Sequence, residues 1–130
     1  MARAAQIAVE FSFMVMLAFV FFAVVLILVA AYLEYASRQT GLAALQDEAS
    51  SLQQELLLAS NVQDGYRRTI LLPDELDGRQ YAIANDASTL TLSFDDGTTY
   101  SRDIPPVSGS FAIGSDTIKT IGGSIIITQP

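Results

Sequence analysis

The stretch FSFMVMLAFVFFAVVLILVAAYL, residues 11–33, contains no charged side chain. A helix of roughly 23 residues, at about 1.5 Å per residue, is long enough to cross a hydrocarbon layer about 30 Å thick. A helix on the surface of a small soluble domain would carry polar side chains on one face, and this one is apolar on every face. We therefore predict that residues 11–33 form a membrane-spanning helix.

The charges on either side of this stretch predict its orientation. Arg3 precedes it, and the acidic residues that give the 130-residue chain its net charge of −7 lie almost entirely after it. The positive-inside rule then places the N-terminus in the cytoplasm and the C-terminal part outside. A cleavable secretory signal is the alternative, but its apolar region is shorter, about 7–15 residues, and is followed by small residues at the cleavage site. Here the small residues, Ala4 and Ala5, come before the apolar run.

The segment that leads into the apolar run reads Arg3-Ala4-Ala5, then QIAVEFSFM at residues 6–14. It resembles the class III signal of type IV pilins in its archaeal form, in which Gln-x-Ser-x-Glu-x-x-x-Leu follows the cleavage position. In that pattern Ala5 and Gln6 form the processing site and Glu10 is the acidic residue at the fifth mature position. Ala8 and Met14 depart from the pattern, since they stand where it has Ser and Leu.

The resemblance implies a function in filament assembly. It implies a leader at residues 1–5 with Arg3 as its charge, removed by a prepilin peptidase, and a helix that then forms the core of a homo-oligomeric helical filament. It also implies a pilus assembly ATPase, a membrane platform protein and a role in surface adhesion. We expect the charge of Glu10 to pair with the new α-amino group of Gln6, because an unpaired buried charge is costly.

After residue 33 the pattern becomes amphipathic without a break in the helix. Apolar or small residues recur at alternating spacings of three and four, at Leu42, Leu45, Ala49, Leu52, Leu56 and Ala59. No proline precedes Pro73, and Gly41 alone weakens the helix, by about 1 kcal/mol. We predict one helix over residues 6–60, whose second half packs against the C-terminal region; a free coiled coil is the alternative.

From residue 61 to residue 130 the pattern is that of short strands separated by turns. The turn signals include Asp77-Gly78, Asp96-Gly97 and Gly122-Gly123. Leu90, Leu92 and Phe94 should face one side of a strand. We predict an α+β fold with a small antiparallel sheet or sandwich as an extracellular head domain. Its strands are expected at residues 67–72, 80–84, 90–94, 98–103, 111–113, 117–121 and 124–128.

Composition argues against catalysis. The chain has no cysteine, which removes a thiolate nucleophile and a zinc-thiolate site, and no histidine, which removes the commonest general base and metal ligand. The acidic runs Asp74–Asp77 and Asp95-Asp96 lack the spacing of a calcium loop. We predict no catalytic residue, no cofactor, no metal and no nucleic-acid partner, since an acidic surface repels phosphate. A minor pilin or pseudopilin, or a single-span membrane protein with an external binding domain, remains the alternative function.

Overall fold

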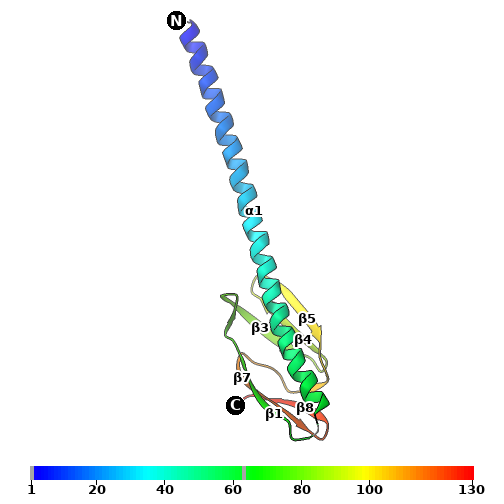
Figure 1. The fold of residues 1–130 in the computed structure, drawn as a ribbon. Helices are drawn as coiled ribbons and strands as arrows, with labels where there is room; N and C mark the ends of the chain where they lie inside the picture. Colours follow the sequence, from blue (N-terminus) through cyan, green and yellow to red (C-terminus); the bar gives the residue numbers. More distant parts are fainter. Residues whose placement is uncertain (1, 63) are drawn as a thin grey trace. The chain divides into compact units, whose positions relative to one another are not determined.

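The computed structural model describes residues 2–62 and 64–130, so Met1 of the predicted leader and Gln63 lie outside the described residues. Within these described residues, one long helix, α1 (Ala2–Asn61), is followed by eight strands (Figure 1). The predicted end of the helix is confirmed within one residue. Its start is earlier than predicted, because Ala2–Ala5 of the predicted leader are helical; the sequence ARAAQ contains no glycine or proline that would break the helix. The chain divides into a first unit that ends at Ser37 and a second unit, Arg38–Pro130.

The second unit, called the head here, contains two four-stranded sheets. The first has the order β1 (Arg67–Leu72), β7 (Gly114–Ile121), β8 (Ser124–Thr128) and β6 (Val107–Ser108). The second has the order β2 (Glu75–Leu76), β3 (Arg79–Asn85), β4 (Thr89–Phe94) and β5 (Thr99–Asp103). The α+β prediction is confirmed. The sheets are not wholly antiparallel, because β6 pairs with β8 in parallel.

The helical stripe predicted from the spacing of apolar residues forms one wall of the core. Leu45, Ala49, Leu52, Leu56 and Ala59 are at most 3% exposed and pack with buried residues of both sheets. The prediction that the stripe covers the head is therefore confirmed. Leu42, its first predicted member, is only half-buried, and Gly41 is buried instead.

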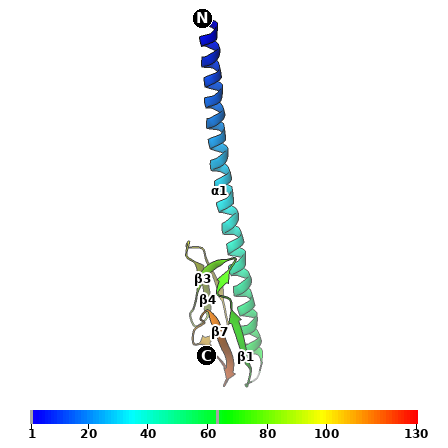
Figure 2. The same cartoon turned by 90° about the vertical axis from the view of Figure 1, so that its left-hand side faces the viewer.

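The two sheets follow one another along this part of the helix (Figures 1 and 2). Near the middle of the head segment of α1, Gln53 donates to the carbonyl of Asp103 in β5 at 2.7 Å, and Arg102 donates to Ser50 at 2.6 Å. Near the end of α1, the Thr120 hydroxyl of β7 donates to the carbonyl of Ala59 at 2.9 Å. The strand β4 turns Leu90, Leu92 and Phe94 inward, as its alternation predicted.

The predicted strand at residues 111–113 is wrong. Phe111 is buried, but its backbone N–H donates to the side chain of Asn85 at 2.9 Å, and that of Ala112 donates to Asp116 at 2.9 Å. Asn85 also donates to the carbonyl of Gly109 at 3.0 Å. The side chain of Asn85, from a distant strand, and that of the nearby Asp116 thus take the place of a strand partner. Gly109 lies in the left-handed region, and a Cβ there would meet the carbonyl oxygen of Ile127, so the loop requires glycine.

At Gly41 the helix lies close to the second sheet. A Cβ on Gly41 would lie 2.8 Å from the Arg79 guanidinium and 3.1 Å from the Phe94 ring. Arg79 in turn stacks 4.1 Å above the centroid of that ring and forms an ion pair with Asp96 at 2.6 Å. Hydrogen bonds from the backbone N–H and the hydroxyl of Thr98, together with Arg79, lower the pKa of Asp96 to about 2. The glycine thus makes room for a stacked cation next to the helix.

We predict that Gly41→Leu destabilises the head by about 2–3 kcal/mol, because the larger side chain must displace Arg79 and Phe94. Chemical unfolding of the full chain in detergent measures the change. Ala43→Leu, at an exposed position two residues away, is the matched control and should change the free energy of unfolding by less than about 0.5 kcal/mol. Equal stability of the two variants would contradict the close approach at Gly41.

A second polar feature lies between the helix and strand β3. Tyr81 is 4% exposed, and its hydroxyl has no hydrogen-bond partner among the described residues. Burial, and then the charges of Glu48 and Asp74, raise the pKa of Tyr81 to about 12. Burial also raises the pKa of Glu48 on the helix. Glu48 therefore holds its proton to a higher pH in the folded head than in the unfolded chain.

The pKa of Glu48 is higher in the folded than in the unfolded chain, so the charge of Glu48 lowers the free energy of unfolding at neutral pH. This penalty decreases as the pH falls through the folded pKa and is gone below the unfolded pKa. We predict that Glu48→Gln raises the free energy of unfolding at pH 7 by up to about 1 kcal/mol, since water screens the half-exposed carboxylate, and that the gain vanishes near pH 3. Unfolding curves at both pH values check this. Glu75→Gln, an exposed glutamate, should show no such difference; the same gain at both pH values for Glu48→Gln would refute the explanation.

Candidate functional site: the apolar helix segment

The first unit presents the apolar run on all sides. Every residue from 11 to 33 is exposed, among them five phenylalanines: Phe11, Phe13, Phe19, Phe21 and Phe22. By length and composition this is a helix that could cross a membrane, and none of its most apolar window is buried within the chain. Large apolar area in contact with water is unfavourable by about 25 cal/mol per Å². This surface is therefore one that lipid or another protein has to cover.

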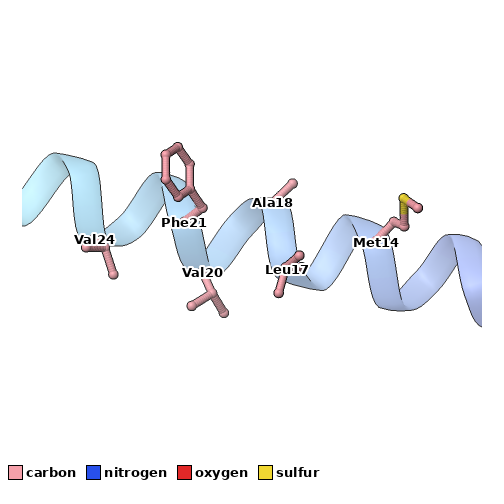
Figure 3. A pocket seen from close by; sticks show the side chains of 6 residues that line it. All are labelled: Met14, Leu17, Ala18, Val20, Phe21 and Val24. Carbon is pink, nitrogen blue, oxygen red and sulfur yellow. The ribbon is translucent and has the colours of Figure 1, made fainter.

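Ala18 creates two hollows on the surface of this helix. One is lined by Met14, Leu17, Ala18, Val20, Phe21 and Val24, whose side chains are seen in Figure 3, and the other by Val15, Ala18, Phe19 and Phe22. Small residues flanked by large ones let a side chain or the backbone of a second helix approach closely. This feature was not predicted from the sequence, although Ala18 is the only residue smaller than valine between Phe13 and Phe22.

The residues of the predicted processing site all lie on α1. Arg3, Ala5, Gln6 and Glu10 are exposed, and the Gln6 side chain donates to Glu10 Oε1 at 3.3 Å. Gln6 and Glu10 are four residues apart, so they occupy the same face of the helix. The two residues to which the resemblance assigns processing and assembly are thus neighbours.

The acidic runs weighed as metal sites lie in turns of the head. Asp74 and Asp77 flank the short strand β2, and Asp95-Asp96 lie between β4 and β5. Among the residues that the structure describes, no group of three or more His, Cys, Asp or Glu side chains is placed to hold a metal ion. Lys119, the only lysine, lies on β7.

Comparison of the chain with known protein families, with curated protein sequences and with solved structures gives no match.

Proposed function

We propose that this protein is the structural subunit of an extracellular, type IV pilus-like filament. The observation that carries the proposal is the exposed apolar segment at residues 11–33, directly preceded by Arg3-Ala4-Ala5-Gln6 and Glu10. The precursor sits in the cell membrane with its N-terminus in the cytoplasm and its head outside. Cleavage before Gln6 leaves the apolar helix in the mature chain, and the function is structural and adhesive, not catalytic.

Assembly moves the apolar helix from lipid into a bundle of the same helices. Lipid is as apolar as leucine, so this step depends on close packing and on interhelical hydrogen bonds. The hollows around Ala18 support such packing, because each accepts a large side chain of a neighbouring helix. In the proposed pathway a prepilin peptidase, an assembly ATPase and a platform protein act on the chain in turn.

Glu10 would fix how neighbouring helices align along their axes in the bundle. A carboxylate in an apolar environment costs several kcal/mol unless it is paired or protonated. Cleavage before Gln6 would create an α-ammonium group on the same face of the helix as Glu10. In a bundle, this ammonium group of one copy neutralises Glu10 of the same or a neighbouring copy.

Two other functions share the apolar helix. A minor pilin or pseudopilin would have the same cleavage and a small copy number. A single-span membrane protein with an external binding domain would keep its first five residues and form no filament.

We predict that the protein sheared from the surface of its native host begins at Gln6 and is recovered in fibres. Intact mass and N-terminal sequencing of the sheared fraction measure both properties. Ala5→Leu, which places a large side chain at the processing site, should leave the full-length precursor in the membrane fraction. A parent chain that still starts at Met1 and occurs only in membranes would exclude the filament and favour the single-span anchor.

We predict that Glu10→Gln lowers the amount of filament at least about tenfold without lowering membrane insertion, because it leaves the buried α-ammonium group unpaired, at a cost of about 3–5 kcal/mol. Quantifying the subunit in sheared and membrane fractions checks this. Glu34→Gln, at the other end of the apolar run, is the matched control and should assemble like the parent. Normal filament yield for Glu10→Gln at neutral pH would rule out the charge pair.

A further inference from the structure

The outer face of the β1–β7 pair carries two cations directly opposite each other. Arg67 pairs with Lys119 in the antiparallel register. Lys119 lies between Ile118 and Thr120, which are 0% and 3% exposed and face the core, so Lys119 points away from the helix. Directly opposed side chains share a face, with Cβ atoms about 5 Å apart. The guanidinium and ammonium groups are therefore neighbours on the surface.

Neither cation has an anionic partner within the described part of the chain. Arg68 points to the other face and forms its ion pair with Glu55 at 2.9 Å. Asp64, the acidic residue closest in sequence to Arg67, accepts the backbone N–H of Gly123 at 2.9 Å. Like charges placed directly opposite each other destabilise a sheet. A carboxylate from outside the molecule would remove this repulsion.

The same face also carries exposed apolar side chains. Leu71 on β1 and Ile121 on β7 are 79% and 59% exposed, and between them the hydroxyls of Thr69 and Thr117 are hydrogen-bonded to each other at 3.3 Å. Arginine together with exposed apolar groups is typical of protein interfaces, whereas a solvated sheet face is usually polar. We call this surface, defined by Arg67, Thr69, Leu71, Thr117, Lys119 and Ile121, the basic face.

A surface of opposite charge lies elsewhere on the head. Asp74, Glu75 and Asp77 are exposed and take part in no ion pair within the described residues. The buried Leu76 between them and the pairing of β2 with β3 hold this turn in place. Three carboxylates are thus presented on an ordered segment, called the acidic turn here.

The basic face and the acidic turn cannot neutralise each other within one copy. Arg67 begins strand β1, and Asp74 follows two residues after its end at Leu72. Six residues of strand at about 3.3 Å each therefore separate the cations Arg67 and Lys119 from the acidic turn by about 20 Å. A contact between them must therefore join two copies, and because it joins different surfaces it can repeat from copy to copy. Heterologous contacts of this kind form open helical filaments when the rotation does not close a ring.

We propose that the basic face of one head docks on the acidic turn of a second copy of this chain. The inference rests on the proposed filament and adds to it the surfaces through which neighbouring heads attract each other. The net charge of −7 makes most approaches between two copies repulsive. The basic face is where the attraction of opposite charges selects one orientation.

Charge reversal on separate chains tests the proposal. One chain carries Arg67→Glu and Lys119→Glu, and the other carries Asp74→Lys and Glu75→Lys. Thr69→Cys on the basic face and Gln80→Cys, which lies on β3 directly opposite Glu75 of the acidic turn, report the contact through a disulfide, because the parent chain has no cysteine. The full chain is used in detergent micelles, so the readout does not depend on filament formation. Asp95→Lys, an exposed acid in another turn, is the matched control.

Each reversed chain alone should give about tenfold less cross-link than the unreversed cysteine chain, and a mixture of the two should restore the yield. Raising the salt concentration should weaken the cross-link in the unreversed chain. Equal cross-linking in all chains would overturn the proposal. A loss of cross-linking that the mixture does not restore would also overturn it, and would mean that Arg67 and Lys119 bind another anion, such as a lipid headgroup. If the heads cross-link in micelles while the protein in its native host is found only in the membrane fraction, the filament would be refuted and the docking surface retained.

Discussion

The head depends on the contact between the helical stripe and the inner faces of two small sheets. A β-domain of about 70 residues buries little apolar surface and is only marginally stable by itself. Leu45, Leu52 and Leu56 supply the missing wall, and because one helix covers both sheets, it also joins them into a single core. Gly41 and Thr120 mark the two ends of this contact, the first by allowing close approach and the second by a buried hydrogen bond. The apolar segment before Ser37 takes no part in that core and is available for a different environment.

Those parts of the fold that depend on local periodicity could be predicted from the sequence. The spacing of Leu45 to Ala59 and the alternation in β4 both appear as expected, since each reports burial on one face. The strands β2 and β6 are two residues long and carry no periodic signal, so only their pairing partners reveal them. The error at residues 111–113 has a related cause, because two of the hydrogen bonds of this loop are made with Asn85, a distant side chain.

The residues discussed for function also fall into those that the sequence predicts and those that only the structure reveals. The apolar run and the spacing of Gln6 and Glu10 are visible in the sequence, because a helix places residues four apart on one face. The opposition of Arg67 and Lys119 is not, because it depends on the register between strands separated by more than 40 residues of chain. The role of Gly41 could not be predicted from the sequence either, because it depends on the side chains of Arg79 and Phe94, which are distant in sequence and lie beside Gly41 in the fold.

The edge strands of the two sheets have a consequence for solubility. An exposed edge offers unpaired backbone groups to other chains and can start aggregation, and charged side chains on the edge oppose this. Strand β1 ends the first sheet and begins with Arg67-Arg68, whereas β5 ends the second sheet and closes with Arg102-Asp103. These two of the four edge strands therefore carry charge where a foreign strand would add. In the filament proposed above, crowded heads can then remain separate folded units, without merging into a continuous cross-β sheet.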